Sequence, residues 1–295
     1  MTMNEVGLVT IVIPCYNHAH FLCEAIESVQ KQTYRRHETI VVNDGSSDNT
    51  SEVAGKFSDV RLIVQKNTGL ATARNAGLEK SRGEFIVFLD ADDRLLPNAL
   101  EIALKAFEKH SDCAFVSGFC KFISLDGSPL TYLKQPRFDD ESDHYAALLK
   151  NSYIWSPANV VYRRKIFERV AGFNADVNPA ADYELYLRIA RQFPVYQHGE
   201  IVAEYRKHNT SMSGNPGLML KNVLQVLDWQ KEVVKTNADY KKARRLGIKY
   251  YSYLYGKGIV YQMFDYLLKL KFKKAIQSIA TLFDFAKMSF NIYRK

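Results

Sequence analysis

The chain has 295 residues, of which 47% are hydrophobic and 24% charged, a composition typical of a folded protein and not of a disordered one. Its formal net charge of +8 raises nucleic acid as a partner, but the basic excess is confined to the C-terminal part. Residues 218–295 carry 16 Lys and Arg against 5 Asp and Glu, whereas residues 1–217 carry 24 against 27. No recognised nucleic-acid motif accompanies the charge, so we expect no nucleic-acid partner.

The N-terminal segment lacks the basic region and long apolar run of a signal peptide. No window reaches the roughly 18 uninterrupted apolar residues of a spanning helix, because Asp265, Asp284 and Lys287 interrupt the most apolar ones. The four cysteines show no metal-ligand spacing, which favours free thiols in a reducing compartment. We expect a cytoplasmic protein, with peripheral attachment to the cytoplasmic face of the membrane left open.

Strand-like and helix-like patterns alternate through the first part of the chain. Short apolar and β-branched runs predict strands at residues 8–13, 38–42, 61–65 and 84–89. Apolar residues at helical spacing predict helices at residues 20–32, 48–57, 72–81 and 98–109. This alternation predicts an α/β fold, with a mostly parallel sheet flanked by helices. Ligands of such sheets bind where the carboxyl ends of the strands emerge.

The pattern is less regular after residue 98, with strand-like pieces around residues 114–124 and an acidic stretch at residues 139–143 that we interpret as a solvated loop. The turn signal at residues 215–217 precedes a continuously helical pattern. We therefore expect one large domain over residues 1–217 and a basic helical region over residues 218–295.

Two aspartates, Asp90 and Asp92, directly follow the fourth predicted strand. In extended chain, residues two apart point the same way, so these carboxylates face a common space. Neighbouring carboxylates repel each other unless a cation or protons neutralise them. Mg²⁺ or Mn²⁺, which prefers carboxylate oxygens and leaves places for phosphate, would do so. The alternative is a loop whose aspartates cap the helix that follows Pro97.

Four segments match, in order and spacing, the pattern of family 2 glycosyltransferases: VTIVIPCYN at 9–17, VVNDGSSD at 41–48, NTGLATARNAG at 67–77, and FLDADD at 88–93 with Pro97 behind it. Over roughly residues 8–215 the chain resembles an inverting member of that family with the Rossmann-like GT-A fold. The QxxRW signature of processive polysaccharide synthases is absent, so it resembles a non-processive member. The resemblance implies a nucleotide-sugar-binding half over residues 1–97 and an acceptor half over residues 98–217.

The activity implied is transfer of one sugar from a nucleotide diphosphate sugar to an acceptor hydroxyl, in surface polysaccharide or glycolipid assembly. The acceptor would be a saccharide or a lipid-linked saccharide. The resemblance assigns the donor nucleotide to Pro14, Tyr16, Asn17, Asp44, Gly69, Arg74, Asp90 and Ala91.

Within that donor pocket, the family's aspartate at the position of Asp44 accepts a hydrogen bond from the base, most often from N3–H of uracil, so we expect a UDP-sugar. Asn43 stands where the common pattern has a first aspartate. The alternative for Asp44 is an Asx turn ahead of the next helix. Arg74, in a helix start of small residues, could meet uracil or the diphosphate, and a surface salt bridge is its alternative.

The resemblance also assigns Asp182 as the general base, although Ala181 replaces the glutamate that usually precedes it. The alternative is that Asp182 only caps its helix. His208 matches a histidine that can join Asp92 as a metal ligand, and imidazole suits Mn²⁺ better than Mg²⁺. We expect Mn²⁺ or Mg²⁺ as cofactor. His18 and His20 are loop residues without an assigned role.

Three other classes of protein fit the sequence less well. A sugar nucleotidyltransferase needs a glycine-rich phosphate loop near its N-terminus, where this chain has Pro14 to Asn17. A catalytically silent nucleotide-sugar-binding or scaffold protein would have lost metal or base residues, which remain here. A dinucleotide oxidoreductase is disfavoured because no GxGxxG follows the first strand.

The basic tail combines lysines with aromatic residues, and Ile276, Ile279, Phe283 and Phe290 fall on one helical stripe. Basic amphipathic helices with aromatic edges lie in membrane interfaces, which predicts an anionic membrane surface as partner. The alternative is that these helices pack on the large domain or on a second subunit of a homo-oligomer.

Overall fold

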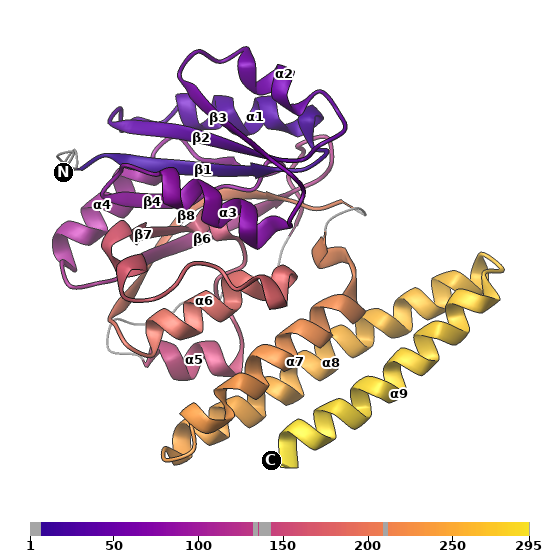
Figure 1. Cartoon of the computed structure of the whole chain (residues 1–295). Helices are drawn as coiled ribbons and strands as arrows, with labels where there is room; N and C mark the ends of the chain where they lie inside the picture. Colours follow the sequence, from indigo (N-terminus) through magenta and orange to yellow (C-terminus); the bar gives the residue numbers. More distant parts are fainter. Residues whose placement is uncertain (1–6, 132–134, 136–142, 209–211, 295) are drawn as a thin grey trace. The chain divides into compact units, whose positions relative to one another are not determined.

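A computed structural model describes residues 7–131, 135, 143–208 and 212–294. The chain forms two compact units, which Figure 1 shows together and which are described one at a time. The first comprises Met1–Ser142, Tyr153–Ala175 and Arg188–His208, and the second comprises Asp143–Ser152, Asp176–Leu187 and Asn209–Lys295. The boundary expected at residue 217 divides the chain differently, because two earlier segments group with the C-terminal helices.

The first unit is built on a sheet in the strand order β3-β2-β1-β4-β7-β6-β8-β5. The strands are β1 (Val9–Cys15), β2 (His37–Asp44), β3 (Val60–Gln65), β4 (Phe85–Phe88), β5 (Arg94–Leu95), β6 (Phe115–Ile123), β7 (Val160–Arg163) and β8 (Val195–Arg206). β1 to β4 are parallel, as expected, and β6 is parallel to β8. β7 runs antiparallel to β4 and β6, and β5 antiparallel to β8.

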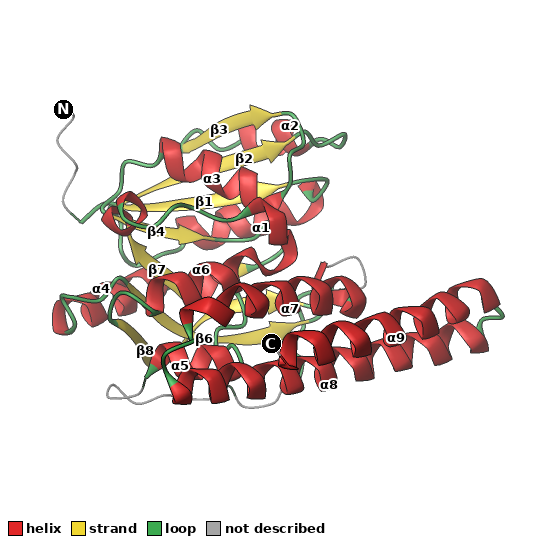
Figure 2. Cartoon of the chain, turned by 60° about the horizontal axis from the view of Figure 1, so that its bottom comes forward, coloured by secondary structure: helices red, strands yellow, loops and turns green. Residues whose placement is uncertain are grey.

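Helices flank this sheet, as Figure 2 shows. They are α1 (Ala19–Gln30), α2 (Thr50–Gly55), α3 (Leu70–Lys80) and α4 (Ala99–Lys109), with short 3₁₀ turns at η1 (Pro157–Asn159), η2 (Arg164–Glu168) and the start of η3 (Ala175–Ala180). Each helix and strand predicted between residues 8 and 124 is present. The α/β fold with a largely parallel sheet is therefore confirmed.

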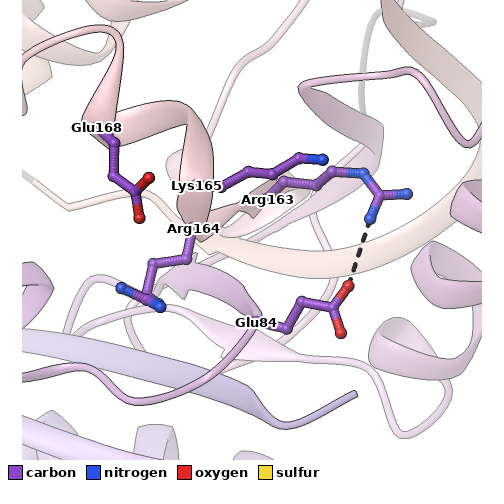
Figure 3. Close-up of a pocket in the computed structure, with 5 residues that line it drawn as sticks. All are labelled: Glu84, Arg163, Arg164, Lys165 and Glu168. Atoms are coloured by element: carbon purple, nitrogen blue, oxygen red, sulfur yellow. Dashed lines mark hydrogen bonds and ion pairs between the residues drawn. The ribbon is translucent and has the colours of Figure 1, made fainter. Parts of the chain in front are cut away.

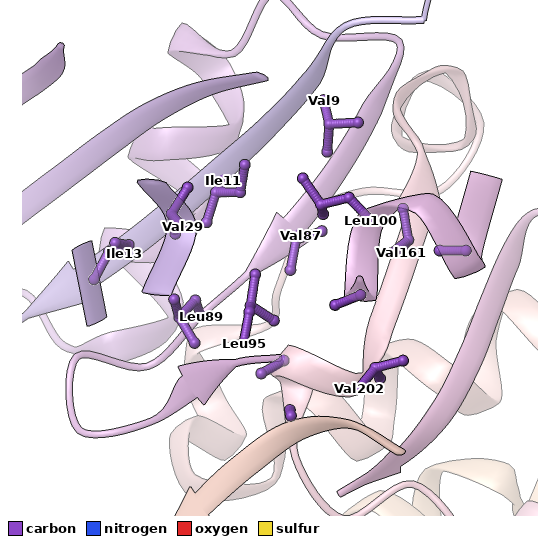
Figure 4. Close-up of a cluster of buried hydrophobic side chains, with 14 of the residues drawn as sticks. Val9, Ile11, Ile13, Val29, Val87, Leu89, Leu95, Leu100, Val161 and Val202 are labelled. Carbon is purple, nitrogen blue, oxygen red and sulfur yellow. The ribbon is translucent and has the colours of Figure 1, made fainter. Parts of the chain in front are cut away.

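The core of the first unit lies between the sheet and its helices (Figure 4). Every residue of β1 is buried, which fits a central strand covered on both faces. Val9, Ile11 and Ile13 pack with Val29 of α1 in one apolar cluster. On α3, a Cβ added to Gly77 would lie 2.2 Å from Cγ1 of Val12, so only glycine lets this helix come so close to β1.

The second unit is helical and contains α5 (His144–Lys150), most of α6 (Ala181–Ala190), the short η4 (Met212–Gly214), α7 (Pro216–Val233), α8 (Ala238–Leu268) and α9 (Phe272–Arg294). The turn predicted at residues 215–217 is the start of α7. The Asn215 side chain accepts a hydrogen bond from the Leu218 amide, and Pro216 occupies the first turn, where a missing N–H costs nothing. Asn237 caps α8 in the same way.

The C-terminal helices are held together by buried contacts. The Arg244 guanidinium donates hydrogen bonds to the carbonyl oxygens of Leu227 in α7, at 2.6 Å, and of Ile292 in α9, at 3.4 Å. α8 also lies against α5, where a Cβ on Gly247 would be 2.0 Å from the carbonyl oxygen of Leu149. The continuous helical pattern predicted after residue 217 is confirmed. Within the described residues, none of the helices is both long enough and apolar enough to cross a bilayer.

Candidate active site

Hydrogen bonds between side chains and backbone join the loop after β1 to the loop after β2, at the carboxyl edge of the sheet. Asn17 adopts a left-handed backbone conformation (φ 56°), which asparagine tolerates better than most residues. Its side-chain oxygen accepts a hydrogen bond from the Ser47 amide at 2.8 Å, and its own amide donates to the Ser46 hydroxyl at 3.0 Å. The two loops therefore form one surface, from which the half-exposed Tyr16 ring projects.

Asp44, at the end of β2, is buried and organises the loop that leads into α3. Its Oδ1 accepts hydrogen bonds from the Gln65 side chain (2.7 Å) and the Thr68 amide (3.0 Å), and its Oδ2 accepts from the Gly69 amide (2.9 Å). Gly69 has a φ of 96°, a conformation that favours glycine. A carboxylate has about four acceptor positions, so Asp44 can hold this loop and still accept a further donor at Oδ2.

The buried Arg74 and the partly exposed Asp90 form an ion pair at the same edge. Nη2 of Arg74 lies 2.7 Å from Oδ1 of Asp90, and the guanidinium stacks over the Phe173 ring at 5.2 Å from its centroid. The alternative of a surface salt bridge for Arg74 is wrong, because its side chain is 3% exposed. Burial raises the pKa of Asp90, as does neighbouring Asp92, while Arg74 lowers it.

Asn75, the residue after Arg74, holds the glycine-aromatic turn of residues 172–173. Its side chain accepts a hydrogen bond from the Phe173 amide and donates one to the Phe173 carbonyl, each at 2.8 Å. A Cβ on Gly172 would lie 2.2 Å from the Asn75 side-chain oxygen, so this turn needs glycine. Asn75 thus fixes the position of Phe173, whose ring contacts the Arg74 guanidinium.

Asp92 meets His208, which follows the last residue of β8 by two positions. Nε2 of His208 lies 2.8 Å from Oδ2 of Asp92, and the two side chains are 4% and 14% exposed. Although burial alone would raise the pKa of Asp92, hydrogen bonding to His208 and the charges of His18 and His208 hold it below its ordinary value. The sequence placed these two residues together, and the structure brings them into contact.

This pair fits a divalent cation as two ligands of an incomplete set. Ligands at right angles on an ion with bonds of about 2.1 Å are about 3 Å apart, close to the separation of these two atoms. Across the residues that the structure describes, no group of three or more His, Cys, Asp or Glu side chains is arranged to hold a metal. An ion here would take its other ligands from phosphate oxygens and water, as Mg²⁺ in phosphate sites commonly does.

A buried network of hydrogen bonds, which the sequence did not predict, holds the segment of Asp92 and the end of β8 in place. Asp93 Oδ1 accepts a hydrogen bond from the Arg206 amide at 2.9 Å, and its Oδ2 accepts one from the Ser156 hydroxyl at 3.0 Å. The Arg206 side chain donates to the Asp92 carbonyl oxygen at 2.8 Å and pairs with Glu24 at 2.6 Å. Burial and the two neighbouring aspartates raise the pKa of Asp93 well above its usual range.

His18 also lies in this site, although no role was predicted for it. Its ring centroid is 5.8 Å from that of His208, and burial lowers its pKa, against the opposing charge of Asp92. The Phe21 ring packs on His208 at 5.5 Å and under the Arg206 guanidinium at 4.8 Å. The spacing of Asn17, His18 and Phe21 at a strand-to-helix junction was the signal available in the sequence.

Pro14 and Ala91, the remaining residues of the predicted donor-binding set, are both buried. Pro14 is buried within β1, and the Ala91 side chain belongs to the apolar core, so Ala91 can offer only backbone atoms to a ligand. All ten residues predicted to bind donor or metal belong to the first unit and follow or adjoin the carboxyl ends of β1, β2, β4 and β8 or the start of α3.

Asp182 belongs to the second unit, in the first turn of α6. Its Oδ1 accepts a hydrogen bond from the Tyr183 amide at 2.8 Å. Burial, and then the charge of Asp182, raise the pKa of Tyr255 on α8. The Tyr183 ring contacts the Tyr251 ring in a tilted arrangement, with centroids 5.6 Å apart, and the Tyr251 hydroxyl accepts a hydrogen bond from the Ser152 amide. A cluster of tyrosines therefore surrounds the start of α6.

A separate cavity of about 150 Å³ lies at the opposite, amino end of β4 (Figure 3). Glu84, Arg163, Arg164, Lys165 and Glu168 line it. Arg163 pairs with Glu84 at 3.5 Å, and Arg164 Nε donates to the Gly83 carbonyl oxygen. Because β4 separates it from Asp90, this cavity is no part of the site described above.

Comparison with known proteins finds that residues 10–171, more than half of the chain, match the model of "Glycosyl transferase family 2". The chain is 30% identical over 270 residues to a hyaluronan synthase of Pasteurella multocida, covering 85% of this chain and 24% of that protein. It is 31% identical to the putative teichuronic acid biosynthesis glycosyltransferase TuaG of Bacillus subtilis, covering 70% of this chain and 82% of that protein. The chain spans between about a fifth and a third of the length of several of its curated relatives.

Solved structures share the fold at low sequence identity. Residues 1–349 of S. aureus TarS in complex with UDP-GlcNAc align with a TM-score of 0.68 and 18% identity, covering 95% of this chain and 81% of that one. The mannosyltransferase PcManGT of Pyrobaculum calidifontis, in complex with GDP-Man and Mn²⁺, aligns with a TM-score of 0.57 and 18% identity, covering 97% and 86%. The GT-A fold is thereby confirmed.

Proposed function

The chain belongs to glycosyl transferase family 2, and on that basis we propose that it transfers a single sugar from a UDP-sugar to an acceptor hydroxyl with inversion of configuration. The observation that carries the proposal is the contact of Asp92 with His208 beside the Arg74–Asp90 pair, at the edge of the sheet where α/β enzymes bind ligands. The names of two relatives, a hyaluronan synthase and a putative teichuronic acid biosynthesis glycosyltransferase, support a saccharide acceptor, which we extend to a lipid-linked saccharide.

Asp44 supports the choice of nucleotide. Its one remaining acceptor position at Oδ2 suits uracil, whose N3–H is a single donor between two carbonyl acceptors. Adenine has an acceptor at N1, and guanine would bring two neighbouring donors, N1–H and its N2 amino group, to that one position. Because Asp44 also fixes the Thr68 and Gly69 amides, base recognition and the shape of the β3–α3 loop depend on one carboxylate. TarS is in complex with UDP-GlcNAc and PcManGT with GDP-Man, so the choice of UDP rests on Asp44.

Asp92 and His208 would hold the Mg²⁺ or Mn²⁺ ion. When bound, the ion supplies positive charge that stabilises the charge developing on the departing diphosphate. Arg206 fixes the Asp92 backbone, so the carboxylate does not have to be reoriented when the donor binds. Arg74, neutralised in part by Asp90, contributes a second cationic group on this edge.

Asp182 would accept the proton of the acceptor hydroxyl as the new glycosidic bond forms. A single displacement by that hydroxyl inverts the anomeric carbon, so an α-linked donor gives a β-linked product. The support for Asp182 is its place in the family pattern, after the turn of residues 172–174 and in the first turn of α6.

The experiment that tests the function measures hydrolysis of a panel of UDP-, GDP- and TDP-sugars with and without Mn²⁺, with water replacing the acceptor. Proton NMR follows the anomeric signal of the first sugar released. We expect turnover with a UDP-sugar and initial formation of the β-anomer from an α-linked donor. Binding of UDP-sugars without hydrolysis or transfer would indicate a silent binding protein, and initial release of the α-anomer would overturn the inverting mechanism.

A further inference from the structure

The turn between α8 and α9 exposes a compact apolar group, which we call the hairpin tip and define as residues 264–276. Leu268, Leu270 and Phe272 are 85%, 74% and 58% exposed. Phe264 and Ile276, on the flanking helical turns, are also exposed. Figure 2 shows α8 and α9 side by side, joined by this short turn. Large apolar side chains gathered at one tip mark an interaction surface.

The backbone conformation at the hairpin tip does not favour a leucine at position 270. α8 ends in a Schellman turn, because the Leu270 amide donates to the Leu267 carbonyl and the Lys271 amide to the Tyr266 carbonyl. Leu270 occupies the left-handed position of that turn (φ 54°), which glycine adopts at lower cost. A leucine in this conformation that is 74% exposed buries little apolar surface in return for its backbone strain. Its side chain is therefore available for a partner.

The tip is basic as well as apolar. Lys269, Lys271, Lys273 and Lys274 are exposed and interleave with the apolar residues. Asp265 pairs with Lys269 at 2.8 Å and is the one acidic residue between positions 264 and 276. This combination suits an interface with an apolar layer and an anionic surface. The apolar side chains would enter the layer, and the lysines would contact the anionic groups.

Charge argues against a second copy of this chain as the occupant. Residues 238–294 carry twelve Lys or Arg against three Asp, and basic residues lie at both ends of the hairpin, as with Lys241 and Lys242 near the start of α8. Pairing two hairpins tip to tip or tip to base would therefore bring like charges together. An anionic lipid surface is complementary to the whole hairpin.

We propose that the hairpin tip inserts Leu268, Leu270 and Phe272 into the outer part of an anionic lipid bilayer, with the four lysines at the phosphate level. This goes beyond the transfer reaction, since it assigns a membrane-docking surface to the second unit. It also narrows the membrane contact, expected from the sequence for the whole basic tail, to one turn of the chain.

The test is flotation of the full chain with vesicles of phosphatidylcholine alone or mixed with phosphatidylglycerol. We expect binding to the mixed vesicles at low salt and residual binding at high salt, because salt screens the lysines but not the apolar contact. Replacing the four lysines with glutamine should lower the partition coefficient by up to about fivefold for each lysine. The variant Leu268→Ser/Leu270→Gly/Phe272→Ser should bind weakly and lose all binding in high salt.

Two further variants separate docking from folding. Leu270→Gly relieves the left-handed backbone, so it should unfold at an equal or higher temperature while binding vesicles more weakly. Val64→Ser/Leu125→Ser removes two exposed apolar side chains of the first unit and should bind as the unmodified chain does. UDP-sugar hydrolysis should be unchanged in all of these variants, which separates failure of docking from failure of the proposed function.

Three results would overturn the proposal. The full chain could remain unbound to phosphatidylglycerol vesicles at low salt, or the tip variants could bind as well as the unmodified chain. Sedimentation velocity could instead reveal a dimer that the triple tip variant abolishes, with no vesicle binding, in which case the occupant is a second copy.

Discussion

Nε2 of His208 lies 2.8 Å from Oδ2 of Asp92, although 116 positions separate the two residues in the chain. The contact forms because β5, which begins two residues after Asp92, pairs with β8, and because the buried Asp93 accepts a hydrogen bond from the Arg206 amide. An acidic group and an imidazole held in this way can accept a divalent cation without a large rearrangement.

UDP should stabilise the protein against heat more than GDP or ADP at equal concentration. The reason is mass action on the native state by the nucleotide whose base brings a single N–H donor to the one open acceptor position of Asp44. At a concentration of 100 times Kd, the gain is about 2.7 kcal/mol. Differential scanning fluorimetry in the presence of Mn²⁺ measures the shift. Equal shifts for the three nucleotides would mean that Asp44 does not read the base.

Asp182→Asn should lower kcat for transfer by about 10²- to 10⁴-fold, the usual contribution of a general base. The Kd for UDP should not change, because the residues proposed to bind the nucleotide belong to the first unit. Asp176→Asn, an exposed aspartate of the same unit, is the matched control and should behave as the unmodified chain. A small loss in Asp182→Asn, equal to that in the control, would assign the carboxylate to capping of α6.

Gly77→Ala should destabilise the protein by about 1–3 kcal/mol, the usual cost of an overpacked core. A Cβ there would lie 2.2 Å and 3.0 Å from the two methyl groups of Val12, in the buried β1 strand. Gly55→Ala, in α2, is the control because a Cβ there meets nothing within 4 Å. The control should be neutral or up to about 1 kcal/mol more stable. Urea unfolding compares the two, and equal midpoints would contradict the close packing of α3 on β1.

His198, on β8, should make stability depend on pH. Burial lowers its pKa to about 4, and its Nδ1 has no hydrogen-bond partner in the described part of the chain. Because the folded-state pKa lies below the ordinary value of about 6.5, protons bind the unfolded chain more readily. The contribution of the neutral ring is thus complete above pH 6.5 and is lost as the pH falls from 6.5 towards 4.

Between pH 7 and pH 4 the unmodified chain should therefore lose about 3 kcal/mol more unfolding free energy than His198→Asn, which cannot titrate there. Urea midpoints at intervals of half a pH unit measure the difference. Parallel curves for the two proteins would show that the imidazole is solvated or charged in the folded state.

Much of the fold followed from local pattern. β1 and β2 are fully or almost fully buried apolar runs, and the first-turn and cap residues of α7, Asn215 and Pro216, were visible as a turn signal. The pairing of β6 with β7 and β8 was not predictable, because these strands are separated by residues 124–159 and by α6, and no local feature sets their register.

Some residues of the site could likewise be predicted from the sequence, and others could not. Asp44, Arg74, Asp90 and Asp92 stand within contiguous motifs, so their common edge could be predicted from strand ends. Arg206 could not, because its role depends on burial and on a carbonyl 114 positions away. Isolated basic residues are usually solvated, and nothing in the neighbouring sequence distinguishes this one.

Metal-dependent sugar transfer is tested by UDP release from a UDP-sugar as a function of Mn²⁺ concentration, for the unmodified chain, Asp92→Asn and the exposed control Asp112→Asn. We expect saturable activation by Mn²⁺ in the unmodified chain and the control. Asp92→Asn should lose at least about 100-fold in rate, since one charged ligand is removed, with an unchanged unfolding midpoint. Undiminished turnover in Asp92→Asn, or full activity of the unmodified chain in excess chelator, would rule out a metal ion held by Asp92.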